Sequence, residues 1–217
     1  MMIEFNQVCK RYPGGFEALS EVNFSLEKGE MAFLTGHSGA GKSTLLKLIA
    51  MLEKPTSGQI IIHGTRLNQL KKRDIAGFRS TLGITFQSPY LLNDRSVFDN
   101  VALPLKIQGI HPQKLTKRVH AALDMVGLLS KAKLLPIHLS QGEQQRVGIA
   151  RAVVHKPQLV LADEPTGNLD PSLSSEVMKI FEDFNQVGVS VLIATHDLAL
   201  IAGMRHRILM LRGGRLC

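Results

Sequence analysis

The sequence predicts an α/β protein in which a buried parallel sheet is joined to antiparallel strands and to a helical insert. Three observations lead to this prediction. The apolar runs within 158–162 and 189–194 are typical of strands buried in a parallel sheet. The segment 3–26 alternates apolar and polar residues, as antiparallel strands do. The segment 96–129 repeats its apolar residues at helical spacing.

The antiparallel strands open the chain and are separated by the turn Pro13-Gly14-Gly15. Tyr12 lies at the end of the first of these strands. A tyrosine at a strand edge either packs against its neighbours or offers a surface on which a nucleic base can stack. The loop that follows favours the stacking role.

A glycine-rich loop separates the apolar run 31–34 from the helix-like segment 45–50. Glycines allow such a loop to bend sharply, and the helix that follows aims its N–H groups and positive dipole end at one point. We therefore predict that the loop binds phosphate. Lys42 is placed to reach the β- and γ-phosphates of a nucleotide, and Ser43 is placed to hold a magnesium ion. The loop consists of Gly36, His37, Ser38, Gly39, Ala40, Gly41, Lys42, Ser43 and Thr44.

After this loop we expect a strand at 59–63, a charged helix at 74–79 and a strand at 82–86. Gln87 directly follows the last of these strands and is therefore expected at its carboxyl end. The amide of Gln87 has both a donor and an acceptor, so it can contact a magnesium ion or an attacking water.

The segment 96–129 is predicted to be an inserted helical subdomain. It begins with a capping box from Ser96 to Asp99, and Gly127 ends its second helix. One apolar face is predicted to pack as core, and it consists of Leu115, Val119, Ala122, Leu123 and Val126.

A second loop with a helix start, 139–146, leads into a helix that has Val147, Ala150, Arg151 and Val154 at helical spacing. Ser140 is suited to cap this helix, and its hydroxyl, together with the N–H of Gly142, can also face an anion. Capping is the commoner role of such a serine, so both roles stay open at this point.

Charged residues follow the two buried strands. Asp163 and Glu164 come directly after the first, and His196 follows the second. Ligands bind beyond the carboxyl ends of parallel strands, so these side chains are expected beside the phosphate loop. Asp163 is expected to hold a magnesium-bound water and Glu164 to deprotonate the attacking water, with His196 bonded to the γ-phosphate or to Glu164.

Composition limits the class of protein. The 217 residues are 44% apolar, and the apolar segments fall well short of the roughly 18 residues that a membrane span needs. No signal peptide is recognised, and Cys9 and Cys217 lack metal-type spacing, so a cytoplasmic protein is expected. The formal charge of +8 favours an anionic partner, which could be nucleotide, nucleic acid or the inner face of a membrane.

In this order the motifs resemble those of the ATP-binding-cassette family over essentially the whole chain. The resemblance assigns Tyr12 to the adenine-stacking aromatic and Leu139 to Gln145 to the signature motif. The remaining matches are 36–44 to the Walker A loop, Gln87 to the Q-loop, Asp163 and Glu164 to Walker B, Asn168-Leu169-Asp170 to the D-loop and His196 to the switch histidine.

The resemblance implies a P-loop NTPase fold of the ABC ATPase type in a single domain, 1–217. The nucleotide-binding core and β subdomain would comprise 1–88 and 157–217, and the helical subdomain 89–156. It also implies hydrolysis of ATP with Mg²⁺ by a head-to-tail homodimer. Lys42, Gln87, Glu164 and His196 would be catalytic, and Ser43, Gln87 and Asp163 would hold the metal. ATP would contact Tyr12, the loop 36–44, Ser140, Gln141, Gly142, Glu143 and Asp170.

The signature departs from the commonest form of the family, because Gln141 and Glu143 stand where Gly and Gln are usual. If the backbone at Gln141 needs a positive φ, the glutamine is strained there.

Within the family, the segment 91–105 is similar to the ATPases of bacterial cell division. Their partner is an integral membrane protein of the FtsX type, which would place this chain on the cytoplasmic side of the inner membrane. Tyr90, Leu91 and Leu92 would then either line a docking groove or fill the core of the helical subdomain. Lipoprotein-releasing and macrolide-export ATPases share the segment 163–170 and remain an alternative.

Two other classes fit less well. A DNA-associated ABC ATPase would carry a long coiled-coil insertion, and no sustained heptad repeat lies between Leu52 and Leu139, so no nucleic acid is expected. A nucleotide-responsive scaffold without turnover would not need Glu164.

Overall fold

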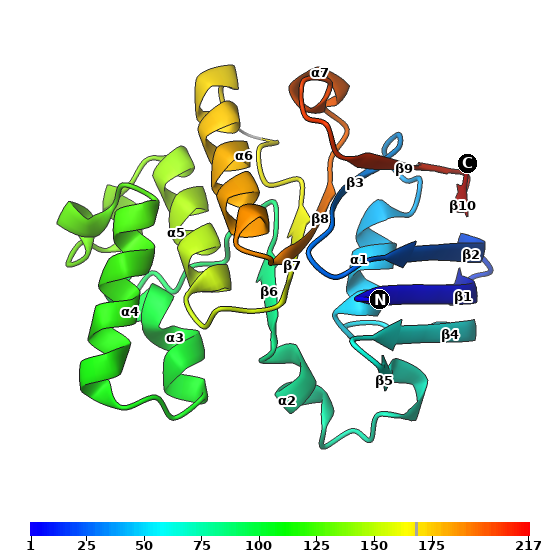
Figure 1. The fold of residues 1–217 in the computed structure, drawn as a ribbon, viewed down its shortest axis with the longest axis horizontal. Coiled ribbons are helices and arrows are strands. Elements are labelled where there is room, and N and C mark those ends of the chain that lie inside the picture. Colours follow the sequence, from blue (N-terminus) through cyan, green and yellow to red (C-terminus); the bar gives the residue numbers. More distant parts are fainter. Residues whose placement is uncertain (168) are drawn as a thin grey trace.

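The protein, described here by a computed structural model, is built on two sheets (Figure 1). The structure describes residues 1–167 and 169–217, and Asn168 of the expected D-loop lies outside the described residues. The strands are β1 (Ile3–Arg11), β2 (Glu17–Leu26), β3 (Met31–Thr35), β4 (Ser57–Ile62), β5 (Thr65–Arg66), β6 (Leu82–Thr85), β7 (Leu159–Asp163), β8 (Ser190–Ala194), β9 (Arg207–Arg212) and β10 (Arg215–Leu216). The helices are α1 (Lys42–Ile49), α2 (Ile75–Arg79), α3 (Val97–Ile107), α4 (Pro112–Met125), α5 (Gln141–Val153), α6 (Pro171–Gln186) and α7 (Leu198–Ile201).

The larger sheet has the strand order β10-β9-β3-β8-β7-β6. The five strands from β9 to β6 are parallel, and β10 adds an antiparallel edge. Strands far apart in the sequence are therefore neighbours: β3 pairs with β8 and β9, and β6 pairs with β7. The predicted parallel sheet is present, and its carboxyl ends lie at one edge.

The smaller sheet is antiparallel, with the order β2-β1-β4-β5. Its first two strands are those expected from the alternating pattern of the N-terminal segment, and Figure 1 shows the sheet beside α1. Register shifts interrupt the pairing of β1 with β2 after Phe5, so the ladder between the two strands is locally irregular.

The side chains of the parallel sheet alternate between two hydrophobic cores. Phe33, Val160 and Ile193 face the core that also contains the buried residues of α3 to α6. Ala32, Leu161 and Leu192 face the other core, which α1 and the antiparallel sheet complete. Both faces of the sheet are therefore covered, which explains why its strands read as continuous apolar runs.

The helical insert packs as expected. The five residues of the predicted apolar face are all buried. Pro112 begins α4, and Gly127 follows its end with φ +69°. Ser96 caps α3 by accepting a hydrogen bond from the Asp99 N–H. Figure 1 places α3, α4 and α5 together, away from the antiparallel sheet. The subdomain boundaries at 89 and 156 stay a prediction.

Within the described ranges, no helix combines the length and the apolar character that crossing a bilayer requires.

His155 is a half-buried titratable group just beyond α5, and both of its ring nitrogens are shielded from solvent. Burial lowers the pKa of the His155 imidazole below its ordinary 6.5, and the backbone of Leu82 partly opposes this shift. The folded state therefore favours the neutral ring.

We expect His155 to make the protein less stable in acid. Above pH about 6.5 neither state binds the proton, but at lower pH the unfolded chain binds it first and stability is lost. His155→Leu should therefore flatten the decrease in unfolding free energy between about pH 7 and pH 5, measured by urea denaturation. His120→Leu, at an exposed position of α4, is the control and should leave the slope unchanged. Equal slopes in wild type and His155→Leu would contradict this assignment.

Candidate active site

The parallel order of the strands brings the predicted site residues to one edge of the sheet. Adjacent strands β3, β8, β7 and β6 end at neighbouring points, since Leu34 pairs with Ala194 and Asp163 also pairs with Ala194. The loop after β3, His196 after β8, the carboxylates at the end of β7 and Gln87 after β6 follow in that order. The juxtaposition expected from the sequence is thus a consequence of strand order.

The glycine-rich loop is held tightly between β2 and β9. A Cβ on Gly36 would lie 2.3 Å from the carbonyl oxygen of Leu211, and one on Gly41 would lie 2.6 Å from that of Ala18. Gly41 also has φ +111° as the residue before α1. A side chain at either position would therefore displace backbone atoms. Glycine is needed at both positions because there is no room for a Cβ, and at Gly41 also because of the backbone conformation.

Lys42, Glu164 and His196 form a connected charged group at this loop. The Nζ of Lys42 donates to the carbonyl of Gly36 at 2.7 Å and lies 3.5 Å from Oε1 of Glu164. The other carboxylate oxygen of Glu164 lies 2.8 Å from Nδ1 of His196. The Lys42 and Glu164 side chains are only 8% and 15% exposed, whereas that of His196 is 64% exposed.

This arrangement orients the Glu164 carboxylate. One oxygen faces the lysine of the phosphate loop, and the other is fixed by a histidine that solvent can reach. Glu164 has φ +49°, a conformation that is costly for a residue with a side chain and that is found most often at functional sites. A carboxylate placed in this way can accept a proton from a water that approaches the loop.

Asp163 is the last residue of β7, and its Oδ1 is buried without a hydrogen-bond partner among the described residues. Burial raises the pKa of this carboxyl group, and the Ser43 hydroxyl and the Lys42 charge partly oppose the shift. An unpaired carboxylate oxygen beside a hydroxyl group is a donor set that suits Mg²⁺. The residues expected to hold the metal therefore fit it.

A pocket of about 570 Å³ opens over the loop. Gln87, Glu164 and His196 line it together with the loop residues from His37 to Thr44. The aromatic residue that lines this pocket is Phe16, which is 62% exposed. Tyr12 is not among the residues that line the pocket. Its hydroxyl lies 3.4 Å from Oγ1 of Thr44, and Lys10 lies over its ring. Stacking of Tyr12 on a base stays a prediction.

The second loop begins α5 with a complete capping box. The Glu143 N–H donates to the Ser140 hydroxyl, and the Ser140 N–H donates to the Glu143 carboxylate. A hydrogen bond from Lys131 lowers the pKa of that carboxyl group. Ser140 thus performs the capping role that the sequence left open, and a further role toward an anion stays a prediction.

The condition under which Gln141 would be strained, a positive φ, is not met. Gln141 is the first residue of α5 and is not among the residues with positive φ, so glutamine fits there as well as glycine would. Gly142 is the position where a side chain would be costly, because a Cβ would lie 3.0 Å from Cδ1 of Leu173 on α6. Beside it, Asp170 caps α6 by accepting from the N–H groups of Ser172 and Leu173.

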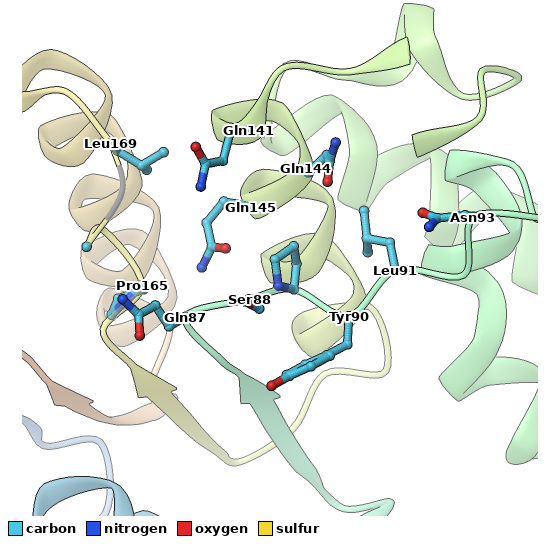
Figure 2. Close-up of a pocket in the computed structure, with 12 residues that line it drawn as sticks. Gln87, Ser88, Tyr90, Leu91, Asn93, Gln141, Gln144, Gln145, Pro165 and Leu169 are labelled. Atoms are coloured by element: carbon cyan, nitrogen blue, oxygen red, sulfur yellow. The ribbon is translucent and has the colours of Figure 1, made fainter. Parts of the chain in front are cut away.

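A separate pocket of about 320 Å³ lies between α5 and the segment after β6. Figure 2 shows Gln141 and Gln145 on the side of α5 toward Pro165 and Leu169, while Gln87, Ser88 and Tyr90 follow one another along the segment. Gln87 lines this pocket and the phosphate-loop pocket alike. It is therefore placed to connect the two.

Tyr90 and Leu91 line the second pocket, and Tyr90 is 72% exposed. Of the two roles left open for this segment, filling the helical core is wrong for Tyr90. Leu91 is partly buried against the core, and Leu92 is 42% exposed.

Three residues of α5 fasten this helix to the segment 86–90. Arg151 donates to the carbonyls of Pro89 and Tyr90, the latter at 3.1 Å. Gln145 donates to the carbonyl of Phe86 at 3.2 Å. Gly148 faces Pro89 so closely that a Cβ would lie 2.9 Å from its side chain. The helix that begins at Ser140 and the segment that contains Gln87 therefore form one unit.

The sequence indicated no role for Phe16 or Arg151. It placed Gln145 in the signature motif but did not indicate its hydrogen bond to the Phe86 carbonyl. An aromatic residue within the glycine-rich turn of the first hairpin was a usable signal for Phe16. Arg151 falls at the helical spacing of the apolar residues of α5, which conceals its role because its partners are backbone carbonyls.

Comparison with protein families matches residues 19–167 to the family described as ABC transporter. Among curated proteins, the chain is similar to the "Cell division ATP-binding protein FtsE" of Escherichia coli (strain K12), with 57% identity over 99% of this chain and 97% of that protein. It is 53% identical to the FtsE of Haemophilus influenzae, over 99% of each chain.

Among solved structures, the chain resembles the ATP-binding cassette MJ0796 in a dimeric post-hydrolysis state bound to ADP and Pi. The TM-score is 0.92 at 34% sequence identity, and the match covers 99% of this chain and 96% of that one.

We expect Arg151→Met to loosen the segment 86–90 from α5. Its two carbonyl groups would lose a charged donor, and hydrogen bonds of this kind contribute about 1.5–3 kcal/mol. Amide hydrogen exchange at residues 86–91 should therefore become faster, and the unfolding free energy should decrease. Arg73→Met, at an exposed position, is the control. Unchanged exchange in Arg151→Met would show that the guanidinium does not hold the segment.

Proposed function

This chain belongs to the ABC transporter family and is an ATPase of that family. We propose that it couples ATP hydrolysis to a membrane partner in bacterial cell division. The family and the cell-division branch expected from the motifs are both confirmed by the relatives. The curated relatives named above favour this branch over the lipoprotein-releasing and macrolide-export alternatives, since both carry the name FtsE.

The proposed reaction is supported above all by the position of Glu164. Its carboxylate lies between the lysine of the phosphate loop and His196, at the mouth of the pocket over that loop. In the proposed mechanism Glu164 takes a proton from the water that attacks the γ-phosphate. His196 orients the carboxylate, and Lys42 exchanges its contact with the Gly36 carbonyl for phosphate oxygens.

Mg²⁺ is part of this proposal. Ser43, Asp163 and Gln87 would hold the ion, which would neutralise charge on the β- and γ-phosphates. The buried, unpartnered Oδ1 of Asp163 supports this assignment.

A head-to-tail homodimer accounts for the separation of the two loops. The solved relative is dimeric. In one subunit here, no residue of the signature motif lines the phosphate-loop pocket, whereas Gln141 lines the other pocket. We propose that Ser140 and Gly142 of one copy close on the triphosphate held by Lys42 of the other, so that ATP joins the two copies.

The membrane partner, of the FtsX type, is proposed to dock at the pocket beside Tyr90. This pocket is lined by Gln87 and by α5, so a segment inserted there would contact the unit formed by the helix and the segment 86–90. The exposed ring of Tyr90 supplies an apolar contact. In this proposal the chain acts at the cytoplasmic side of the inner membrane, where the partner holds it.

Glu164→Gln tests the hydrolytic mechanism. The variant is expected to bind ATP and to stay dimeric with it, but to hydrolyse about 10²–10⁴-fold more slowly, because the amide cannot accept the proton. Turnover is measured as phosphate release. Glu182→Gln, a partly exposed glutamate of α6 that faces His206, should retain full turnover. Normal turnover in Glu164→Gln would place the general base elsewhere.

The same variant tests the dimer. In the Glu164→Gln background, Ser140→Ala is expected to weaken ATP-dependent dimerisation in analytical ultracentrifugation. Ser96→Ala is a matched control, because it removes an equivalent helix cap from α3 at a similar cost of about 1 kcal/mol. If both changes weaken the dimer equally, only the lost cap matters and the cross-subunit contact is disproved.

Docking of the membrane partner is tested by Tyr90→Ala. Less of the FtsX-type protein should co-purify with this variant from detergent-solubilised membranes, while its ATP hydrolysis without the partner stays normal. Ile107→Ala removes a similarly exposed apolar side chain from α3 and should not change co-purification. Full retention of the partner by Tyr90→Ala would argue against this pocket.

A further inference from the structure

We propose that a groove between α4 and the C-terminal ends of α5 and α6 binds an acidic amphipathic segment of another protein. This groove is separate from the two pockets described above and has a volume of about 860 Å³. It plays no part in the proposed ATPase mechanism or in the proposed docking of the membrane partner.

The groove lies at the edge of the sheet opposite the active site. Gln158 and Val160 line it from the start of β7, and Val189 lines it just before β8. The active-site side chains follow the other ends of these strands. A segment bound here would therefore leave the phosphate loop and the signature loop open.

The floor of the groove is apolar and recessed. Ala122, Val153 and Val154 contribute to it and are each no more than 5% exposed. Two larger apolar side chains of the groove stand in solvent: Met125 of α4 is 49% exposed, and Val187, just after α6, is 77% exposed. A recess with two accessible apolar side chains suits the apolar face of an inserted segment.

The lining of the groove carries four cations and no carboxylate. Lys114, Lys117 and Arg118 come from the first two turns of α4, and Lys156 follows the end of α5. None of these four makes an ion pair within residues 1–167 and 169–217. Other cations of the helical subdomain do form ion pairs, for example Lys106 with Asp99 and Lys131 with Glu143. The free charge is therefore available to an anionic partner.

The spacing along α4 explains how charge and apolar surface meet. Residues three or four positions apart share a face of a helix, and Lys114, Lys117 or Arg118, Ala121 and Met125 follow this spacing. The charged part of that face precedes its apolar part. A partner helix with glutamates or aspartates beside a row of apolar residues would match both parts.

Lys156 is held in an unusual conformation. It lies just after α5 with φ +59°, in the left-handed region that glycine usually occupies after a helix. A residue with a long side chain is costly at this position, and such costs are tolerated most often where the side chain has a function. Here the conformation sets a cation beside the groove.

A protein segment fits this groove better than a membrane surface does. The apolar residues form the floor of a recess, which a flat bilayer cannot enter, whereas a helix or strand can project side chains into it. A second copy of this chain docked groove to groove is also disfavoured, because the four cations of one groove would face the same cations of the other.

The proposal is tested with two labelled 14-residue helical peptides. Both carry the same row of leucines, and the other positions are glutamate in one and lysine in the other. In fluorescence anisotropy the glutamate peptide is expected to bind the whole protein and the lysine peptide is not. Salt should weaken this binding, since part of the attraction is between exposed charges.

The charge of the groove is tested by the triple variant Lys114→Glu, Lys117→Glu, Arg118→Glu. We expect the glutamate peptide to bind it at least about tenfold more weakly. The matched control is Lys71→Glu, Lys72→Glu, Arg73→Glu, which makes the same change of charge in another exposed basic cluster and should bind as the wild type does. Both variants should retain basal ATP hydrolysis, which excludes misfolding. Equal losses in the two variants would overturn the proposal, because only overall charge would then matter.

The apolar part is tested by Val187→Asp, with Ile107→Asp as the control at a similarly exposed position of α3. Only Val187→Asp should weaken binding of the glutamate peptide.

Two other results would replace the proposed occupant of the groove. Charge-dependent binding to phosphatidylglycerol vesicles without peptide binding would assign the groove to a membrane surface. Self-association that the triple variant abolishes would assign it to a second copy.

Discussion

The parallel hydrogen bonding of β3, β8, β7 and β6 is the constraint on which the rest of the molecule depends. It places four strand ends side by side, so that residues separated by more than a hundred positions in the sequence meet within hydrogen-bond distance. Glu164 shows the result most clearly, since one carboxylate contacts Lys42 from β3's loop and His196 from the end of β8. A one-residue slip in the pairing of β7 would turn its side chains to the opposite face and separate this group.

The phosphate-loop pocket and the pocket beside α5 are held by different kinds of contact. The phosphate loop is wedged among backbone atoms of both sheets, so its shape is determined before any ligand arrives. The second pocket lies where α5 is fastened to the segment 86–90 through backbone carbonyls. Gln87 borders both pockets. The side chain of Gln87 thus connects the phosphate site with α5, the helix whose first residues belong to the signature motif.

The sequence alone was sufficient for the elements and motifs that depend on local chemistry. Glycines indicate the phosphate loop, apolar runs indicate buried strands, and Ser140 indicates the start of a helix. Spacing alone did not show that Phe16 lines the loop pocket or that Arg151 binds carbonyls, because both depend on neighbours distant in the sequence. Strain at Gln141 was expected only if the backbone there had a positive φ. Gln141 is the first residue of α5 and has no positive φ, so the condition is not met.

The close approach of Gly36 to Leu211 joins the phosphate loop to the last strands of the chain. The carbonyl that would collide with a side chain at Gly36 belongs to β9, and a Cβ on Gly214 would lie 2.9 Å from the carbonyl oxygen of Ala18 on β2. The carboxyl-terminal strands therefore support the phosphate loop, although their side chains do not line its pocket. A change that shifts β9 out of register would therefore alter the shape of the phosphate loop without replacing any motif residue.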